Sequence, residues 1–411
     1  MKILAISDSL RFGGAQISIL EFLELLKNKV EFKVLVCKGA DEKFTSCASS
    51  IGVEVYRVSC HTVMYYPVMN IKSVRKLIEW ADVVWIADVE YLVAPRIKKL
   101  KKVPIAAHLR SYALVCHWWA TLYSLKEVCL KKCSPWRITR CKQGINLELA
   151  KIGLLSSAKA GIYWLLDFAK SPLDYFRWIR LVRGVIDSID GFIPVSKALW
   201  EIHTSHIPEL KKKPFRIVYN LATKPLKYIE PDPNEPYENY ILYASGSNPA
   251  KGPHILLEAW PRVSKEFRDL KLYMVGCRGT WVERLAKKLN ARNVVFLERF
   301  PPDKQYYYMM YKAKAVVMPS LFPEPFGRIP VEANKLGVPV VVTDRGGLPE
   351  IIESNATGVI SNADSKSLAD AIARVVSREW SRSKIIESIY KRITSDNTVN
   401  KLLEFFEELL K

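Results

Sequence analysis

Two glutamates in the last quarter of the chain stand in a pattern that could hold a ligand. Glu324 and Glu332 have seven residues between them, and a Phe-Gly-Arg turn lies in that interval. Apolar runs at 316–319 and 338–343 predict strands, and the segment between them predicts a loop and a helix in a parallel crossover. Both carboxylates then fall at the carboxyl edge of a sheet, where open α/β sheets bind ligands beside helix N-termini that favour phosphate.

Further short motifs accompany this pattern along the chain. After Glu324, Phe326, Gly327 and Glu332 comes Gly-Gly-Leu-Pro-Glu at 346–350. Earlier pieces are M-K-I-L-A-I-S at 1–7, R-F-G-G-A-Q at 11–16, D-G-F-I-P-V-S at 190–196, K-G-P at 251–253 and L-L-E-A at 256–259. In this order they resemble glycosyltransferase family 4, the group 1 retaining glycosyltransferases of GT-B fold. The chain departs from the family at 245–248, where the usual Arg is absent, and at Leu221, where the family has Gly.

The resemblance implies an α/β protein of GT-B fold. Two Rossmann-like domains with doubly wound parallel sheets would face each other across a cleft, and a C-terminal helix would cross back to the first domain. We expect an acceptor-side domain at 1–223 with an insertion at about 112–188, a linker at 224–239, a nucleotide-sugar domain at 240–394 and the returning helix at 395–411.

Apolar periodicity supports the same architecture independently. Helical stretches at 17–27 and 71–80 lie between apolar runs, and this alternation predicts βαβ units and doubly wound sheets. The predicted strands are 2–6, 33–36, 83–86 and 105–107, then 240–244, 271–275, 294–296, 315–318 and 338–343. Four prolines in 224–239 predict the linker.

By resemblance, the second domain binds the donor. Glu324 would hold the donor sugar and Glu332 would accept hydrogen bonds from ribose hydroxyls. The backbone N–H groups of Phe326, Gly327 and Arg328 would contact sugar or phosphate, and Arg328 could replace the family's missing Arg. The alternative is that both glutamates only cap a helix and face water.

Other candidate residues lie near expected strand ends. Lys251 stands at a strand-to-helix turn, where an ammonium group can neutralise charge on a departing diphosphate. Gly13 and Gly14 open the first helix and would let the chain approach phosphate or acceptor, although such a pair can be a simple tight turn. His108 matches a family position that faces the donor sugar, but a lone His is often structural. Arg110 could meet an acceptor phosphate.

The mechanism that the resemblance implies retains the anomeric configuration of the transferred sugar. The acceptor hydroxyl would attack from the side of the leaving group, and a leaving phosphate oxygen would take its proton. No cofactor or catalytic metal is then required. Asp88-Val89-Glu90 is similar to a metal motif of another glycosyltransferase fold, but its position after a first-domain strand favours a loop.

Composition points to an anionic partner for the first half of the chain. The formal charge of the 411 residues is +20, and residues 1–222 carry +15 of it, with 34 Lys plus Arg against 19 Asp plus Glu. A membrane surface with a lipid-phosphate acceptor, a nucleic acid, or plain solubility could explain this charge. We find no nucleic-acid-binding motif. No signal peptide is visible, and uncharged runs are too short to span a bilayer. We therefore expect a cytoplasmic protein, peripheral on the inner face of the membrane.

The insertion contains a basic, aromatic segment. Ser171-Pro172 predicts a helix start, after which Phe176, Ile179 and Val182 would share one face and Arg177 would lie off it. Such a helix can lie in a membrane interface. It can equally be an ordinary helix whose apolar face is in the core.

Cysteines are concentrated in the insertion. Cys116, Cys129, Cys133 and Cys141 have spacings compatible with a structural zinc site or with disulfides, and free thiols or metal are favoured in the cytosol. The other four are scattered, at Cys37, Cys47, Cys60 and Cys277. His203 and His206 are interpreted as surface positions rather than metal ligands.

The leading hypothesis is therefore a retaining glycosyltransferase that acts on a lipid-linked or other membrane-associated glycan acceptor. A nucleotide-sugar 2-epimerase of the same fold is the alternative enzyme, and it would need acid/base carboxylates and histidines in the cleft without an acceptor site. A nucleic-acid-binding protein is supported by charge alone.

Overall fold

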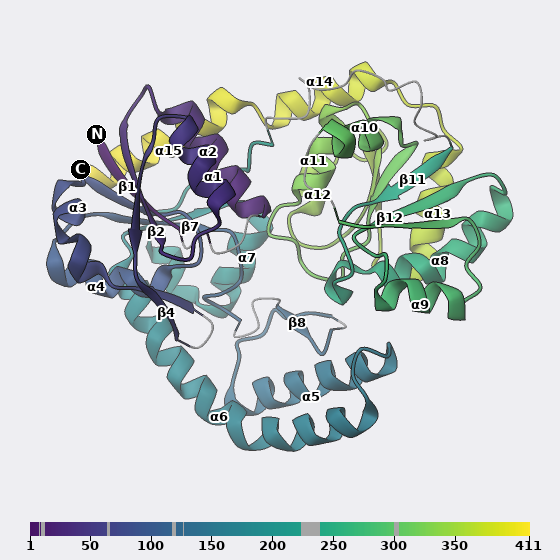
Figure 1. The fold of residues 1–411 in the computed structure, drawn as a ribbon, viewed down its shortest axis with the longest axis horizontal. Coiled ribbons are helices and arrows are strands. Elements are labelled where there is room, and N and C mark those ends of the chain that lie inside the picture. Colours follow the sequence, from purple (N-terminus) through teal and green to yellow (C-terminus); the bar gives the residue numbers. More distant parts are fainter. Residues whose placement is uncertain are drawn as a thin grey trace.

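The computed structural model describes residues 1–7, 9, 13–63, 66–116, 121–125, 127–222, 239–299 and 304–411. The predicted linker lies outside these ranges except for Asn239, as do Arg11 and Phe12 of the N-terminal motif. Two six-stranded parallel sheets lie side by side, each covered by helices (Figure 1). The chain is thus a two-domain α/β protein.

The first sheet is built from strands of the N-terminal half. Its strands are β1 (Lys2–Ile6), β2 (Glu31–Cys37), β3 (Glu54–Val58), β6 (Val83–Ile86), β7 (Ile105–Leu109) and β10 (Gly191–Pro194), in the spatial order β10-β7-β6-β1-β2-β3. The central strands are buried along their length, as expected when helices cover both faces of a parallel sheet.

Helices pack on both faces of this sheet. Ile3 and Ala5 of β1 share a core with α1 and the C-terminal helix, whereas Leu4 and Ile6 point to the opposite layer. The helices are α1 (Gly14–Leu26), α2 (Glu42–Ser50), α3 (Arg75–Trp80), α4 (Ala94–Leu100) and α7 (Lys197–His206), with short 3₁₀ turns at Ile71–Val74, Tyr91–Val93 and Pro208–Lys212.

The C-terminal helix α15 (Ser395–Leu410) returns to the first domain, as predicted. Leu402, Phe405 and Phe406 are fully buried there against side chains of the first sheet. Arg216 and Glu408 form an ion pair of 2.9 Å beside this contact. Figure 1 shows the helix beside α1, far along the sequence but close in space.

The second sheet repeats the topology of the first. Its strands are β11 (Tyr240–Tyr243), β12 (Lys271–Val275), β13 (Val294–Leu297), β14 (Ala315–Met318), β15 (Val340–Thr343) and β16 (Gly358–Ser361), in the order β13-β12-β11-β14-β15-β16. Its helices are α8 (Pro253–Glu266), α9 (Trp281–Lys288), α10 (Lys304–Lys312), α11 (Arg328–Lys335), α12 (Leu348–Ile351), α13 (Ser365–Val376) and α14 (Arg382–Arg392), with a 3₁₀ turn at Pro249–Lys251.

Both sheets reverse their strand order beside the first strand of the domain. The switch lies between β1 and β6 in one sheet and between β11 and β14 in the other. Ligands of doubly wound sheets bind outside the carboxyl ends of strands at such a point. The fold therefore offers two facing ligand-binding edges, which confirms the predicted GT-B architecture.

The insertion forms a helical hairpin and one small ribbon, and another ribbon lies earlier in the first domain. The hairpin consists of α5 (Pro135–Lys151) and α6 (Ser157–Ser188), and one ribbon pairs β8 (Leu122–Tyr123) with β9 (Glu127–Val128). A second ribbon, β4 (Cys60–Val63) with β5 (Tyr66–Met69), follows β3. Among the described residues, no helix combines the length and the apolar character needed to cross a membrane.

The prediction that a helix begins at Ser171-Pro172 is wrong. Helix α6 begins at Ser157, and the Ser156 hydroxyl caps it by accepting a hydrogen bond from the Lys159 N–H. Pro172 lies inside the helix. Proline removes one backbone donor there, but α5 contacts α6 on both sides of Pro172, through Lys142 with Asp167 and Asp174, and this packing supports the continuous helix. Phe176 is also not on the buried face, since 59% of it is exposed.

Candidate active site

A cavity of about 820 Å³ opens between the facing edges of the two sheets. Its walls come from the start of α1, the end of β7, the segments after β11, β12 and β13, and the loop before α11. The lining includes all but one of the predicted site residues: Gly13, Gly14, Arg110, Lys251, Glu324, Phe326, Gly327, Arg328 and Glu332. The exception is His108.

Close packing of two loops fixes the position of Glu324. The Gly347 N–H donates to the Glu324 carbonyl oxygen at 2.7 Å, and Gly346 pairs with Glu324 as an isolated bridge. Gly346 has φ +60°, and a Cβ there would lie 2.3 Å from the Glu324 carbonyl oxygen. Only glycine fits, so the Gly-Gly-Leu-Pro-Glu loop acts as a support for the glutamate.

Helix α11 begins at the cavity wall. Gly327 precedes it with φ +106°, and a Cβ at this position would lie 2.5 Å from the Leu348 side chain. The left-handed turn aims the first N–H groups of the helix at the cavity. Free N–H groups at a helix N-terminus favour an anion.

Lys251 and Glu324 form a charged pair on one wall. The Lys251 Nζ lies 2.6 Å from Glu324 Oε1, and the Ser320 hydroxyl donates to the same oxygen at 2.6 Å. Glu324 has 6% of its side chain exposed and Lys251 has 27%. The ammonium group also lies 5.1 Å from the centre of the Phe322 ring. Lys251 can therefore reach a ligand in the cavity, while the Ser320 hydroxyl holds the Glu324 carboxylate in place.

A second charged group joins the two domains. The Arg328 guanidinium lies 2.7 Å from Glu21 on α1 and 3.1 Å from Glu332, and it also donates to the Ser18 hydroxyl at 2.7 Å. Burial raises the pKa of Glu332; Arg328 opposes this shift and Glu21 adds to it. For Arg328, burial lowers the pKa, but Glu21 and Glu332 outweigh it and the net shift is upward. The guanidinium thus remains charged and bridges the cleft.

Arg110 brings a cation from the first domain. Its guanidinium donates to the Ala87 carbonyl at 2.9 Å and to the side chain of Asn220. The side chain is 7% exposed, and burial lowers its pKa to about 10. Arg110 is still charged at neutral pH. Lys251, Arg299 and Arg328 also line the cavity, so Arg110 is one of four positive groups there.

His108 does not face the cleft, so this prediction is wrong. It is fully buried between Phe22 and Trp85, whose ring centres lie 5.8 Å from the imidazole. Burial lowers its pKa well below the usual range. Side chains alternate along a strand, and position 108 shares the side of Ala106, which packs in the core with α1 and α15. The His108 Nδ1 lies 3.3 Å from the Arg110 guanidinium.

Sequence reasoning missed Glu21, Arg299 and Glu350 as cleft residues. Glu21 is the buried partner of Arg328, and Arg299 lines the cavity after β13 as an exposed cation. Glu350 accepts from the Lys197 and Ala198 N–H groups, at 2.9 and 2.7 Å, and so caps α7 from the other domain. Its place in the Gly-Gly-Leu-Pro-Glu motif indicated a role for Glu350, but its partner Ala198 lies 152 residues away in the sequence.

His203 and His206 are buried in α7, so their interpretation as surface residues is wrong. His203 is fully buried and stacks on Tyr112, with ring centres 5.7 Å apart. Its Nδ1 lies 2.8 Å from the Leu199 carbonyl oxygen. Burial lowers its pKa to about 4. His203 is therefore neutral and structural at physiological pH.

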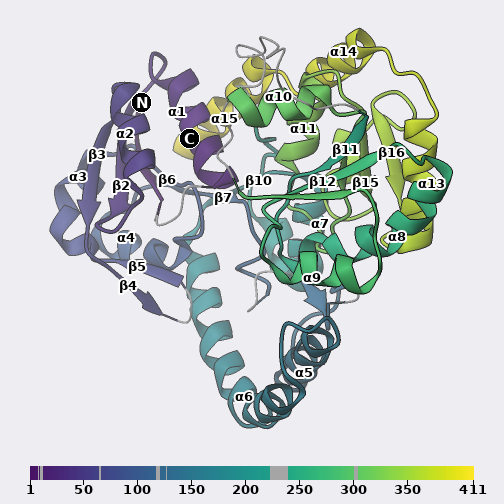
Figure 2. The same cartoon turned by 45° about the vertical axis from the view of Figure 1, so that its right-hand side comes forward.

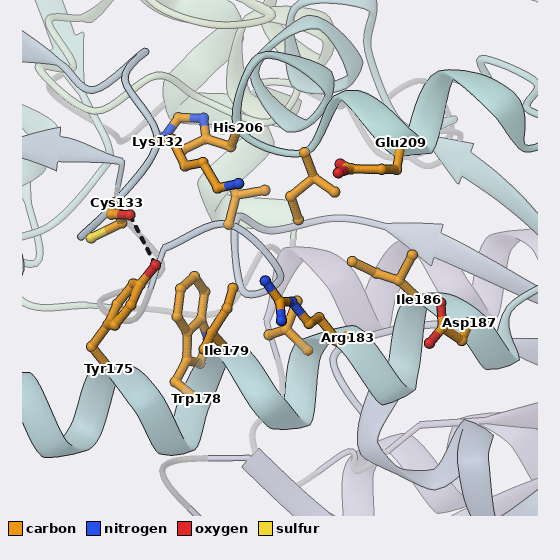
Figure 3. Close-up of a pocket in the computed structure, with 13 residues that line it drawn as sticks. Lys132, Cys133, Tyr175, Trp178, Ile179, Arg183, Ile186, Asp187, His206 and Glu209 are labelled. Atoms are coloured by element: carbon orange, nitrogen blue, oxygen red, sulfur yellow. Dashed lines mark hydrogen bonds between the residues drawn. The ribbon is translucent and has the colours of Figure 1, made fainter. Parts of the chain in front are cut away.

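His206 borders a smaller cavity of about 210 Å³ between the C-terminal half of α6 and α7 (Figure 3). Trp178, Ile179 and Val182 form part of its apolar wall, and Lys132 points into it. The Tyr175 hydroxyl donates to the Cys133 carbonyl at 3.1 Å at one end. No residue of the larger cleft lines this cavity, so it is separate from the candidate active site.

The predicted zinc site in the insertion is not supported. Among the residues that the structure describes, no group of three or more His, Cys, Asp or Glu side chains could hold a metal ion. The Cys141 thiol contacts the Leu122 carbonyl and the Cys129 thiol contacts that of Lys131. Burial raises the pKa of Cys133 to about 12 and of Cys141 to about 11. Burial also acts to raise the pKa of Cys129, but hydrogen bonds from His206 and Arg137 outweigh it and the net shift is downward. Cys116 forms no disulfide bond.

A disulfide is present where sequence reasoning left only scattered cysteines. Cys37 at the end of β2 is bonded to Cys60 at the start of β4. The bond ties the β4–β5 ribbon to the first sheet. Cys47 and Cys277 are free thiols.

Comparison with known proteins gives the class of the second domain. A family model described as glycosyl transferases group 1 matches residues 228–392. The D-inositol 3-phosphate glycosyltransferase of Corynebacterium urealyticum is 30% identical over 173 residues, which are 39% of this chain and 40% of that protein. The chain thus spans less than half the length of this relative, and the match falls short of the whole protein.

Solved structures extend the likeness in fold to the whole chain. The structure of Anabaena Alr3699/HepE in complex with UDP-glucose has a TM-score of 0.68 at 17% identity and covers 99% of this chain and 100% of that one. Sucrose-phosphate synthase from Thermosynechococcus elongatus has a TM-score of 0.67 at 16% identity, covering 100% and 99%. Both support the GT-B fold.

Proposed function

We propose that this protein is a retaining glycosyltransferase of family 4. It transfers a sugar from a nucleotide-diphosphate sugar to a lipid-linked or other membrane-associated glycan acceptor. The observation that carries the proposal is the cleft, where Lys251, Glu324, Glu332 and the N-terminus of α11 converge at the switch point of the second sheet. These residues lie within the segment matched by the group 1 glycosyltransferase model.

Each part of the nucleotide-sugar donor has a binding partner on the second domain. Lys251 neutralises charge that grows on the leaving diphosphate, and the N–H groups of Phe326, Gly327 and Arg328 contact sugar or phosphate. Glu324 holds the sugar hydroxyls and Glu332 holds the ribose. Arg299 is an exposed cation on the same wall and supplies the second phosphate contact that the missing family Arg would make. Arg328 is less suited to this role because Glu21 and Glu332 already occupy its guanidinium.

The acceptor enters from the first domain. Gly13 and Gly14 leave room at the start of α1, and Arg110 meets an acceptor phosphate. The acceptor hydroxyl attacks on the same side as the leaving group, and a phosphate oxygen takes its proton, so the anomeric configuration is retained. The reaction uses no catalytic metal. The positive first domain holds the enzyme at an anionic membrane surface on its cytoplasmic face.

A transfer assay with matched variants tests the proposal. UDP-, GDP- and ADP-sugars are first screened for thermal stabilisation, with UDP-glucose first because it is bound in the HepE structure. Lys251→Met and Glu324→Gln should then each lower transfer by about 100- to 1,000-fold, as for loss of one preorganised charge-stabilising group. Lys265→Met, an exposed lysine on α8, is the control and should transfer normally.

Two results would contradict the proposal. Near-normal transfer by both active-site variants would remove Lys251 and Glu324 from the chemistry. An epimerised nucleotide sugar formed without acceptor would identify a 2-epimerase instead. The burial of His108 leaves the described cleft without a histidine for that reaction.

A further inference from the structure

Most of the exposed large apolar side chains of this protein gather on one element. The α5–α6 hairpin carries ten of the fifteen found among the described residues. Figures 1 and 2 show this hairpin projecting away from both sheets. Soluble proteins rarely leave so concentrated an apolar surface uncovered, and such patches mark sites of interaction.

Five of these side chains form a stripe along α6, which we call the apolar stripe. Its members follow the helical spacing i, i+3, i+4, i+11 and i+14 and are 42 to 65% exposed: Ile162, Leu165, Leu166, Leu173 and Phe176. Side chains at these intervals share one face of a helix. The opposite face of the C-terminal half, with Trp178, Val182 and Val185, is buried in the first domain. The stripe therefore remains largely exposed in the described part of the chain.

The inside of the hairpin holds a cluster of charged and polar groups. Lys142 of α5 has only 7% of its side chain exposed and lies 3.6 Å from Asp174 and 3.9 Å from Asp167 of α6. Asn146 donates to Asp167 at 2.8 Å between the same helices. Burial raises the pKa of Asp167, and Lys142 opposes that shift. A buried charged cluster between the helices and exposed apolar side chains outside them are the reverse of the pattern that water favours.

This reversed polarity suits a hydrocarbon surrounding. Ionisable side chains of membrane-embedded helices face inward and pair with one another, while apolar side chains face lipid. Basic residues follow the stripe along the helix, since Arg177 and Arg180 lie four residues after Leu173 and Phe176. Both arginines are exposed. An apolar region followed by arginines is the arrangement of an interfacial helix beside anionic headgroups.

Charge also distinguishes a bilayer from a second copy of the chain. Residues 135–188 hold nine Lys plus Arg and four Asp plus Glu, a net charge of +5. Two such hairpins packed stripe to stripe would bring like charges together, which is unfavourable. An anionic lipid surface satisfies the apolar stripe and the arginines at once.

We propose that the α5–α6 hairpin is a membrane-inserting arm. The apolar stripe enters the acyl region of an anionic bilayer, Arg177 and Arg180 lie at the headgroups, and the Lys142–Asp167–Asp174 cluster holds the two helices together. The arm fixes the height of the two-domain body above the lipid. The inference deepens the membrane attachment of the proposed function, but its test is separate from the transfer reaction because it measures lipid contact alone.

Vesicle flotation with the full chain tests the arm. The probes are phosphatidylcholine vesicles with and without phosphatidylglycerol, at low salt. Wild-type protein should float with the anionic vesicles, and Leu165→Glu/Leu173→Glu should bind about tenfold less or weaker still, because each buried methylene adds to partitioning. Leu410→Glu is the matched control, an exposed leucine on α15 outside the hairpin, and it should float like wild type.

A second pair of variants separates charge from burial. Arg177→Gln/Arg180→Gln should reduce binding to anionic vesicles and leave the weak binding to neutral vesicles unchanged. Arg284→Gln/Lys288→Gln on α9 is the control, since both residues are exposed. Unchanged circular dichroism and nucleotide-induced thermal shift show that every variant is folded and that its donor site is intact.

Two kinds of result would contradict the proposal that the hairpin inserts into a membrane. The first is wild-type protein that does not float at low salt, or a stripe variant that floats as well as wild type. The second is a lipid-free dimer, seen by analytical ultracentrifugation, that Leu165→Glu/Leu173→Glu converts to monomer. In that case the stripe is a contact between copies of the chain.

Discussion

The ion pair between Glu21 and Arg328 offers a direct test of how the two domains are held together. The Glu21→Gln variant keeps the shape of the side chain and removes its charge. Arg328 then loses its charged partner in the first domain. The Glu332 carboxylate and the Ser18 hydroxyl remain 3.1 and 2.7 Å from its guanidinium nitrogens. Glu21 also accepts from the Ala222 N–H at 3.2 Å, so the change weakens a second contact at the end of the first domain.

The expected cost follows from burial. Glu21 has 1% and Arg328 has 11% of its side chain exposed, so water can replace little of the lost interaction. Removal of one partner of a buried pair costs about 3 to 5 kcal/mol, and the remaining partners of Arg328 place this case near 3 kcal/mol. An unfolding entropy of about 2.1 cal/mol/K per residue, taken over the 411 residues of the chain, converts this cost to a fall in Tm of about 3.5 °C.

Differential scanning fluorimetry without nucleotide measures this shift. The matched control is Glu24→Gln, which makes the same change three residues later on α1 at an exposed position. The control should stay within about 1 °C of wild type, since surface substitutions have small effects. If both variants melt together, the buried pair does not stabilise the closed arrangement of the domains and this reasoning is refuted.

Two further predictions concern residues whose roles the sequence did not reveal. Burial lowers the pKa of His203 to about 4, so between pH 6.5 and 4 the unfolded chain binds a proton that the folded chain does not. The free energy of unfolding should therefore fall as pH is lowered through this range. Denaturant titrations should show a smaller fall for His203→Asn than for wild type, and parallel curves would contradict the burial of His203. The Cys37–Cys60 disulfide predicts six reactive thiols among eight cysteines in unfolded, unreduced protein; mass spectrometry after alkylation that finds eight would exclude the bond.

The interior strands of both sheets were predictable, whereas two of the edge strands were not. Strands such as β14 and β15 are continuous apolar runs because helices cover both of their faces. The edge strands β3 and β16 were missed. Glu54 and Arg57 are exposed in β3, and β16 begins with Gly358, so neither has the apolar run of a central strand. Edge strands contact fewer side chains, and their composition reflects this.

The candidate site was predictable where it depends on sheet topology. Lys251, Glu324 and Glu332 follow neighbouring strands, and parallel strands bring their carboxyl ends to one edge. The contacts across the cleft were not predictable in this way. Glu21 and Arg328 are 307 residues apart, and no local pattern indicates which charges will meet. His108 shows the converse, because a family position alone did not reveal which side of β7 the imidazole occupies.

A crystal structure of the protein with UDP-glucose, or with whichever nucleotide sugar stabilises it most, tests the central claim most directly. The account predicts that the diphosphate lies beside Lys251 and the N-terminus of α11, that the sugar contacts Glu324, and that the ribose contacts Glu332. A nucleotide bound outside the cleft, or one that touches none of these residues, would contradict it.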